Sequence, residues 1–432
     1  MSDLALICIV FTVLTLFGVP LIAGIGITTA LALYLIDIPY TLLGQSGFTA
    51  LQPFPLLTIP LFVLAGRLME VGGMAERLID VAKSFVGGYR GSLSMVTVLA
   101  CMLFAALSGS GPATTAAIGS VMIPAMRRDG YSARFSAAVA ASAGALGSMI
   151  PPSNLLIIYG LVSETSIPRL FLAGFAPGFF VTGLLLLTAY LISVRSGFGG
   201  TAAGARFVAR QCLSAMWAGK WALGAPVLIL GGIYGGAFTP TEAASVAVFY
   251  ALFVGLFVYR RLTIPKIVES LRFTALMAGL LVLLAPAQAF GQLTAFYDVP
   301  TAMQDWVTSL TDNRILVLML IGLFYIAIGT FMESLAQIIL FTAVFLPLVK
   351  SLGVDPVLFG VFTVMTCEIG FLTPPVGGNL NVAARITGIS IEQVSIAVLP
   401  FILAYVLGLL FMILWPEATL FLPNWFYGVS RI

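Results

Sequence analysis

The sequence predicts an all-α polytopic membrane protein built from two inverted repeats, each with a re-entrant helical hairpin and a helix broken at a Pro-Pro pair. Composition, the placement of basic residues and an internal repeat lead to this prediction. Hydrophobic residues make up 60% of the 432 residues and charged residues only 9%, whereas soluble domains carry about a quarter charged residues. Apolar runs near or above the roughly 20 residues that cross a bilayer recur along the chain, without the alternation of a barrel.

Composition also excludes several kinds of chemistry. The chain has no histidine, which removes Ser-His hydrolysis, His-ligated metals and His proton relays. The only Gly-Lys pair is not followed by Ser or Thr, so the chain has no phosphate-binding P-loop. No GxGD motif is present, and the four cysteines share no metal or redox spacing. We therefore expect a protein that is not an enzyme.

The first apolar segment, residues 1–36, contains Asp3 and lacks a basic region before its apolar run. That run is far longer than the 7 to 15 or so residues of a signal-peptide core. We expect it to be one retained membrane helix.

A hairpin is predicted over about 92–126. Basic clusters flank this apolar stretch, with Arg67, Arg77, Lys83 and Arg90 before it and Arg127, Arg128 and Arg134 after it. Because basic clusters mark the cytoplasmic side, both ends should lie on the same face of the membrane. The stretch SGSG (108–111) would then be a tip at membrane depth, which is tolerated only where protein or a water-filled cavity satisfies the backbone. Close packing of small residues is the alternative reading of this stretch. The basic residues themselves are interpreted as orientation signals.

The remaining elements of the first half and the middle of the chain follow from apolar runs. The first repeat half covers 1–200, with a helix over about 131–162 broken at Pro151-Pro152, and then a span at 170–194. Residues 201–220 form a glycine-rich, basic cytoplasmic linker, and further spans follow at 221–235, 240–259 and 270–296. The acidic stretch with Asp298, Asp305 and Asp312 is expected outside.

The second half repeats the first at an offset of 223 residues. The matching positions are Pro124 and Pro347, Gly130 and Gly353, Gly147 and Gly370, Pro151-Pro152 and Pro374-Pro375, and Pro177 and Pro400. Five predicted crossings separate the copies, and an odd number inverts the second copy. We therefore predict that 221–432 is an inverted repeat half, with a hairpin over about 313–350, a tip at FMES (331–334) and a broken helix over about 356–387.

Inverted repeats with broken helices are typical of secondary transporters, whose sites lie at the breaks near the midplane. Broken helices leave carbonyl groups unpaired, and Ser153, Asn154, Thr373 and Asn379 add side-chain oxygens beside them. Such oxygens suit sodium, one ion per repeat. Pro112 fits the start of the helix after the first tip, whose N-terminal amides would favour an anion such as a substrate carboxylate.

Three glutamates lie in or near apolar runs, where ionisable groups are costly and by default functional. Glu333, at the second tip, is favoured for a site or gating role. Glu242 could equally cap a helix, because Thr239 to Glu242 reads as a capping box. For Glu368, structural pairing inside the bundle is as good an interpretation as a functional role.

Four motifs in order resemble the large membrane subunit of tripartite ATP-independent periplasmic (TRAP) transporters: PLLTIPLFVLAGRLMEVGG, SGSGPATTAAIGSVMIPAMRRDGY, GGAFTPTEAASVAVFYAL and EIGFLTPPVGGNLNV. The resemblance implies an elevator-type transporter with a scaffold and a mobile transport domain in the bilayer of the bacterial inner membrane. It implies sodium-coupled import of organic acids, such as sialic acid or C4-dicarboxylates, delivered by a periplasmic binding protein. It also implies a separate small four-helix membrane subunit as a partner.

By the same resemblance, ions and substrate lie at the tips and breaks. The expected sodium-binding residues are Ser108, Gly109, Ser110, Pro151, Ser153, Asn154, Gly329, Thr330, Glu333, Thr373, Pro375 and Gly377. The expected substrate-binding residues are Ser110, Gly111, Asn154, Ser334, Gly378 and Asn379. Asn154 and Gly378 depart from the family pattern, which has an aliphatic residue and a leucine there. A stand-alone ion-coupled dicarboxylate transporter without a binding protein is the alternative function.

Overall fold

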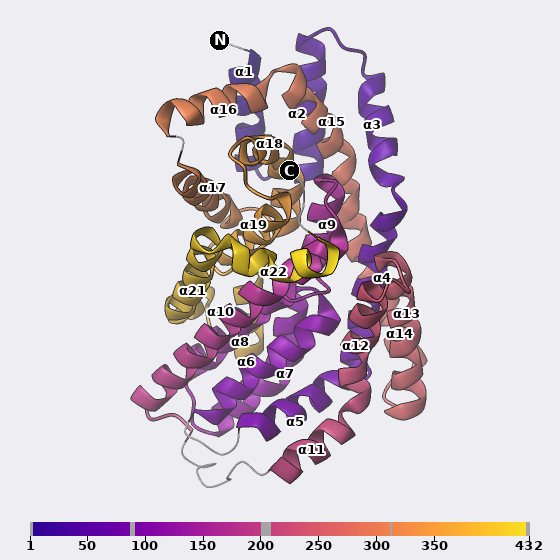
Figure 1. Ribbon diagram of the computed structural model, residues 1–432, viewed down its shortest axis with the longest axis vertical. Coiled ribbons are helices and arrows are strands. Elements are labelled where there is room, and N and C mark those ends of the chain that lie inside the picture. The colour runs from indigo at the N-terminus through magenta and orange to yellow at the C-terminus, as the bar shows by residue number, and fades with distance from the viewer. Residues whose placement is uncertain (1–2, 87–90, 200–208, 312, 429–432) are drawn as a thin grey trace.

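The computed structural model describes residues 3–86, 91–199, 209–311 and 313–428, and this part of the chain is entirely helical. Figure 1 shows an elongated bundle, with α1, α2, α3, α15 and α16 toward one end of its long axis and α5 and α11 at the other. The predicted positions Arg90, Asp312 and 201–208 lie outside the described residues.

The N-terminal segment forms two helices, α1 (Asp3–Leu16) and α2 (Leu21–Leu35), which pack against each other. The prediction of one helix over 1–36 is therefore wrong. Gly18 adopts a φ of +75°, a left-handed conformation that commonly ends helices. Pro20 then stands immediately before the start of α2, and the residue before a proline disfavours the helical conformation.

Three further α-helices precede the first hairpin along the chain. They are α3 (Thr41–Leu51), α4 (Thr58–Val71) and the amphipathic α5 (Met74–Val86). In the predicted hairpin region the chain forms α6 (Ser92–Ser108) and α7 (Gly111–Arg128), two helices that pack together around a turn at Gly109 and Ser110. Ser110 precedes the first residue of α7 and Pro112 lies in its first turn, as the sequence indicates.

The helix after the hairpin is interrupted at the first Pro-Pro pair. It consists of α8 (Ala133–Gly144), a 3₁₀ turn (Ala145–Ser148) and α9 (Asn154–Val162). Proline lacks the N–H that an α-helix needs, so Pro151 and Pro152 separate the two segments. The long α10 (Ile167–Arg195) follows.

The middle of the chain contains α11 (Ala209–Ala218), α12 (Lys220–Tyr234), α13 (Pro240–Phe253), α14 (Ile264–Gly279), α15 (Leu284–Phe296) and α16 (Val299–Leu310). Glu242 accepts from Thr239 N at 2.8 Å, and Glu242 N donates to the Thr239 hydroxyl at 3.3 Å. Thr239, the N-cap residue, and Glu242 thus form a capping box at the start of α13, which is the second of the two roles predicted for Glu242.

The C-terminal part repeats the pattern of α6 to α10. Its helices are α17 (Arg314–Gly329), α18 (Ser334–Ser351), α19 (Pro356–Phe371), α20 (Gly378–Thr387), α21 (Ile391–Leu414) and the additional α22 (Pro416–Tyr427). The two copies interleave, because α20 packs against α7 and α8, α21 against α8, and α18 against α9. Both Pro-Pro bonds are cis, and both Gly130 and Gly353 have positive φ.

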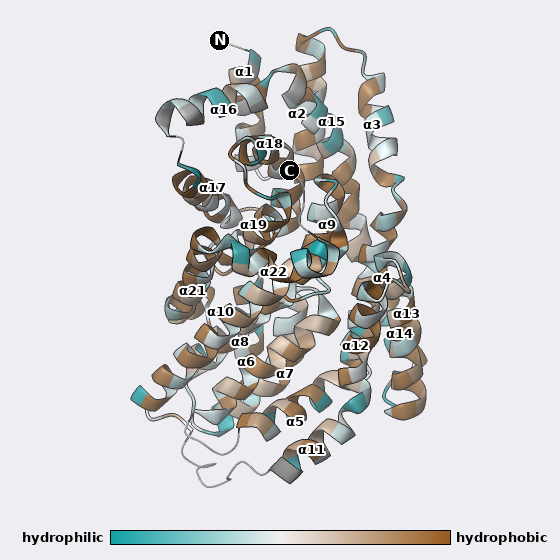
Figure 2. Cartoon of the chain, in the orientation of Figure 1, coloured by the Kyte–Doolittle hydropathy of each residue, from teal (hydrophilic) through white to brown (hydrophobic). Residues whose placement is uncertain are grey.

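Six helices of the described chain are long and apolar enough to cross a membrane, or seven if the bent pair α11 and α12 counts as one span. They cover Phe54–Val71, Ile167–Arg195, Pro240–Val258, Ile264–Thr294, Ser334–Ser351 and Ile391–Leu414. Hydrophobic residues cover most of the helices in Figure 2, on outward-facing turns as well as inside. Exposed side chains such as Phe249, Leu276 and Ile396 fit a lipid environment better than water.

A second group of packed helices lies beside the interleaved repeats. In it α4 packs against α13 and α14, and α15 packs against α2 and α3. Figure 1 shows α3, α4, α13 and α14 along one side of the bundle. The two groups meet where α4 packs against α6 and α9, which places α4 beside the first hairpin tip.

Candidate ion and substrate site

A cavity of about 330 Å³ lies where the two hairpin tips meet. The tips of α6-α7 and of α17-α18 both contribute to its wall, together with residues beside both helix breaks and residues of α4 and α14. The predicted site residues that line it are Ser108, Gly109, Ser110, Asn154, Glu333 and Ser334. The structure therefore brings one tip from each repeat to a single cavity.

The first tip is in direct contact with the first helix break. Asn154 N donates to Gly109 O at 3.1 Å, and Gly111 N donates to the Ser148 hydroxyl at 3.0 Å. A Cβ at Gly109 would lie 2.8 Å from Pro152 O, and Gly109 has a φ of +61°. Only glycine fits both this conformation and this close approach.

The first break itself is buried from Pro151 to Asn154. The Ser153 hydroxyl donates to Ser148 O and accepts from Leu156 N, so it is committed to the start of α9. The side-chain oxygen of Asn154, in contrast, is buried and has no hydrogen-bond partner among the residues that the structure describes. Since buried polar atoms are nearly always paired, this oxygen is the better candidate ligand of the two.

The second tip also contacts its own break. Val376 N donates to Thr330 O at 3.0 Å, and a Cβ at Gly329 would lie 2.9 Å from the Cα of Gly370. The hydroxyl groups of Thr330 and Thr373 donate to carbonyl oxygens of their own helices, at 2.8 and 2.9 Å. The Ser334 hydroxyl is buried, and no described residue forms a hydrogen bond with it.

Several predicted residues of the second repeat do not line the cavity. Pro375 is exposed, and Gly377 stands before the first residue of α20 with a φ of +38°. A Cβ at Gly378 would lie 2.1 Å from the ring of Phe371. That ring occupies the space in which a larger side chain would stand, which accounts for the glycine at this position.

A buried polar cluster connects the two repeats next to the cavity. Glu368 of α19 is 1% exposed and accepts from the Asn379 side-chain nitrogen at 3.2 Å. Its Oε2 would lie 2.9 Å from a Cβ at Gly111, so it faces the first turn of α7, where a negative charge is favoured. Asn379 Oδ1 is buried and lacks a hydrogen-bond partner within the described chain. Glu368 is therefore paired inside the bundle and also lines the cavity.

Sequence reasoning missed the wall contributed by α4 and α14. Arg67, interpreted as an orientation signal, lies within the candidate span Phe54–Val71 and lines the cavity with Glu70 and Phe273. Arg67 Nη1 lies 2.8 Å from Glu70 Oε2, and Nη2 lies 3.1 Å from Glu269 Oε1. An Arg and a Glu three residues apart inside an apolar run were the signal for this feature.

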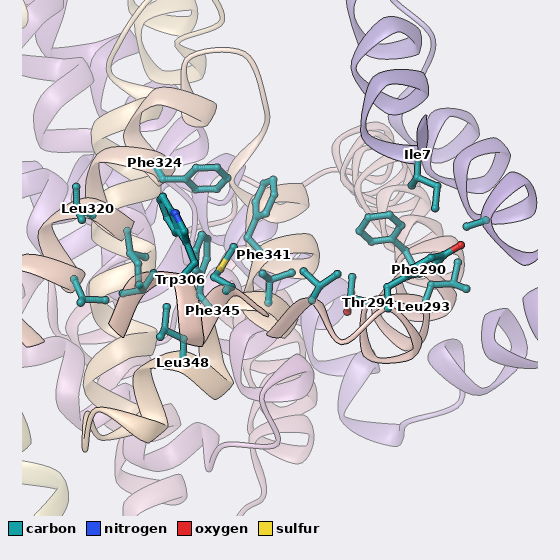
Figure 3. A pocket seen from close by; sticks show the side chains of 18 residues that line it. Ile7, Phe290, Leu293, Thr294, Trp306, Leu320, Phe324, Phe341, Phe345 and Leu348 are labelled. Atoms are coloured by element: carbon teal, nitrogen blue, oxygen red, sulfur yellow. The ribbon is translucent and has the colours of Figure 1, made fainter. Parts of the chain in front are cut away.

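A larger cavity of about 440 Å³ lies elsewhere, between α1, α2, α15, α16, α17 and α18. Figure 3 shows Trp306, Phe324, Phe341 and Phe345 gathered at one end of it and Phe290 and Leu293 at the other. Among the described residues that line this cavity none is charged, and the polar side-chain groups are those of Thr294, Tyr297 and Trp306. The tip cavity, lined by serine, asparagine, glutamate and arginine side chains, is therefore the candidate site for an ion and an organic acid.

Comparisons with known proteins agree with this architecture. The family model described as the tripartite ATP-independent periplasmic transporter, DctM component, matches residues 8–418. The isethionate TRAP transporter permease protein of Oleidesulfovibrio alaskensis is 41% identical over 97% of this chain, which spans 65% of that relative's length. The C4-dicarboxylate TRAP transporter large permease of Pseudomonas aeruginosa is 40% identical over 88% of each chain.

A solved structure supports the fold alone. The crystal structure of the Alcanivorax borkumensis YdaH transporter has a TM-score of 0.63 over 87% of each chain, at 18% identity. The prediction that the chain is not an enzyme is confirmed by its relatives, which are transporter permeases. The match over residues 8–418, with these relatives, shows that the chain is a multi-pass inner-membrane protein belonging to the DctM family of TRAP transporter large membrane subunits.

Proposed function

We propose that this chain is the large membrane subunit of a sodium-coupled importer of organic acids in the bacterial inner membrane. The observation that carries the proposal is the single cavity at which one tip from each repeat meets, lined by polar groups inside an apolar bundle. Broken helices at such a position form the substrate and ion sites of secondary transporters. The relatives are named for isethionate and C4-dicarboxylates, both organic anions.

The tips and breaks would bind sodium through oxygen atoms. Asn154 Oδ1, Ser334 Oγ and Asn379 Oδ1 are buried acceptors without hydrogen-bond partners in the described part of the chain, and Pro152 O points toward the first tip at Gly109. Hard cations bind oxygen ligands, among them amide and backbone carbonyl oxygens. Asn154 and Asn379 stand at the start of equivalent helices in the two repeats, which supports one ion per repeat.

The cavity would hold the organic acid between the tips. The helices α7 and α18 begin at the tips, with Gly111 and Ser334 as their first residues. Helix N-termini attract anions because their first amide groups lack intrahelical partners. Arg67 adds a guanidinium group to the same wall, where it pairs with Glu70.

Transport would proceed by an elevator movement of the interleaved helices α6–α10 and α17–α21 along the group that contains α2, α3, α4 and α13–α15. The hairpins would be re-entrant, because basic clusters flank the first one on the same side. A small four-helix membrane subunit would bind beside the static group. A periplasmic binding protein would deliver the substrate.

Uptake into proteoliposomes tests the proposal. Vesicles that contain this chain and its small subunit should accumulate labelled succinate, isethionate or N-acetylneuraminate only with an inward sodium gradient and the cognate binding protein. Uptake that is indifferent to sodium would contradict the coupling. Uptake without the binding protein would instead identify a stand-alone transporter.

A further inference from the structure

We propose that Arg67 is the residue that recognises the negative group of the substrate. In the absence of substrate, the Glu269 carboxylate occupies the position on Arg67 that this negative group would take. This inference rests on the proposed function and names the part of the cavity that selects an anion. Arg67 is one of five residues of α4 in the cavity wall, with Ile59, Val63, Gly66 and Glu70.

The guanidinium group of Arg67 is held on two sides. Glu70, whose side chain is 18% exposed, accepts from Nη1 at 2.8 Å. The ring of Phe273, on α14, lies 5.4 Å from the guanidinium carbon. A guanidinium over an aromatic ring gains a favourable cation–π contact. Glu70 and Phe273 therefore keep the group oriented without help from a third residue.

The other edge of the guanidinium is only half used. Nη2 donates to Glu269 Oε1 at 3.1 Å, while Nε is buried without a partner among the described residues. Nε and Nη2 form the side-on edge of arginine, which matches the two oxygens of a carboxylate, or two oxygens of a sulfonate, with two parallel hydrogen bonds. Glu269 makes one bond where an incoming anion can make two.

Glu269 is suited to leave this edge. Its side chain is 66% exposed, against 23% for Arg67, and it does not line the cavity. Exposed ion pairs contribute little to stability because water competes for both partners. Its replacement by a substrate with one negative charge leaves the net charge around Arg67 unchanged, which matters where an unpaired charge in an apolar bundle is costly.

If the substrate replaces Glu269, substitutions of Arg67 and of Glu269 should change the KM for uptake in opposite directions. Arg67→Gln should raise the KM for uptake at least about tenfold, because an anion loses a charge-assisted, bidentate partner. Arg67→Lys keeps the charge but loses the fork, so its KM should rise by an intermediate factor. Glu269→Gln should lower the KM about two- to fivefold, the range that an exposed ion pair is worth.

The assay is sodium-driven uptake of labelled succinate, isethionate and N-acetylneuraminate by proteoliposomes of the complete complex. Arg272→Gln is the matched control for arginine, because Arg272 is exposed on α14 and lies outside the cavity. Glu76→Gln is the control for glutamate, because Glu76 is exposed and pairs with Arg261 at 3.4 Å. Both controls should keep the KM of the unmodified complex.

The outcomes separate the two proposals. If the unmodified complex takes up none of the three anions, the proposed function is contradicted, and this inference with it. If it transports but Arg67→Gln and Arg67→Lys keep the normal KM, Arg67 does not bind substrate. If Glu269→Gln raises the KM instead of lowering it, Glu269 supports Arg67 as a structural partner and the exchange is overturned.

Discussion

The two repeats carry the same elements but differ in how far their breaks are buried. Pro151, Pro152, Ser153 and Asn154 are all buried, whereas Pro374, Pro375 and Val376 are exposed. The tips differ less, since Gly109 and Gly111 are buried while the second tip alternates, with Phe331 and Glu333 exposed and Met332 and Ser334 buried. Repeats of one ancestral pattern thus occupy different environments within one molecule.

This asymmetry fits an alternating-access transporter in a state that is open to one side. If both breaks were open, the cavity would connect the two sides of the membrane; if both were closed, substrate would be trapped. Under the proposed mechanism the first repeat forms the sealed side and the second repeat the open side. The four predictions that follow test this difference.

The largest expected effect is at the first break. Changing Pro151 and Pro152 together to alanine lets a continuous helix form, which would remove the close approach of Gly109 to the carbonyl oxygen of residue 152. Uptake in proteoliposomes should fall at least about tenfold, because the buried break positions the first tip. The same change at Pro374 and Pro375 is the matched comparison and should cost less. Equal losses would show that burial of the break does not matter.

The next largest effect concerns the glycines beneath the tips. A Cβ at Gly147 would lie 2.5 Å from Ser110 O, and one at Gly370 would lie 2.7 Å from the Cα of Gly329. Gly147→Ala and Gly370→Ala should each destabilise the protein by about 1 to 3 kcal/mol through overpacking, seen as a lower melting temperature.

Gly183→Ala is the control for these glycines, because it lies within α10 with no atom near its Cβ position. Alanine there should stabilise the helix slightly. Unchanged melting temperatures of both Gly147→Ala and Gly370→Ala would contradict the close packing of each tip against the helix beneath it.

A smaller effect is expected from the hydroxyl groups at the tips. Ser334→Ala removes a buried hydroxyl that has no hydrogen-bond partner among the described residues, and Ser110→Ala removes the hydroxyl of a residue that lines the cavity. Each should raise the sodium concentration for half-maximal uptake by about threefold or more, roughly the net worth of one hydrogen-bond-like contact, with unchanged expression.

Ser120→Ala is the hydroxyl control, since its group donates to Ala117 O of its own helix at 2.9 Å. It should leave the sodium dependence as it is. Unchanged sodium dependence in Ser110→Ala or Ser334→Ala would remove that residue from the ion site.

The smallest effect is expected at Thr330 and Thr373. Their hydroxyl groups already donate to Ala327 O and Ile369 O, so alanine at either position should leave the sodium dependence of uptake nearly unchanged. A large increase in the sodium concentration for half-maximal uptake would place these threonines in the ion site. It would also show that the second repeat contributes more to sodium binding than the first.

Much of this architecture could be predicted from the sequence, because its signals are local. Proline has no N–H and glycine permits close approach. The breaks at Pro151-Pro152 and Pro374-Pro375 and the tip at SGSG can therefore be recognised from the sequence without knowing the tertiary packing. The break between α1 and α2 was missed because one Gly and one Pro in an apolar run carry little weight alone.

The rest of the site depends on packing between distant segments. Arg67 was counted with the cytoplasmic basic residues because its partners, Glu269 and Phe273, lie some 200 residues away. Thr330 and Thr373 have the right chemistry, but helical geometry directs their hydroxyl groups to their own carbonyl oxygens. Only the three-dimensional structure shows which oxygens stay free.

The most direct test of the asymmetry is the accessibility of one position in each break. In a background without the four native cysteines, Ser153→Cys and Val376→Cys are placed at equivalent positions and exposed to a membrane-impermeant maleimide in right-side-out and inside-out vesicles. We expect Val376→Cys to react from one face only and Ser153→Cys to be protected, becoming reactive from the opposite face when sodium and substrate drive turnover. Reaction of both cysteines from the same face would contradict the inverted arrangement on which the account depends.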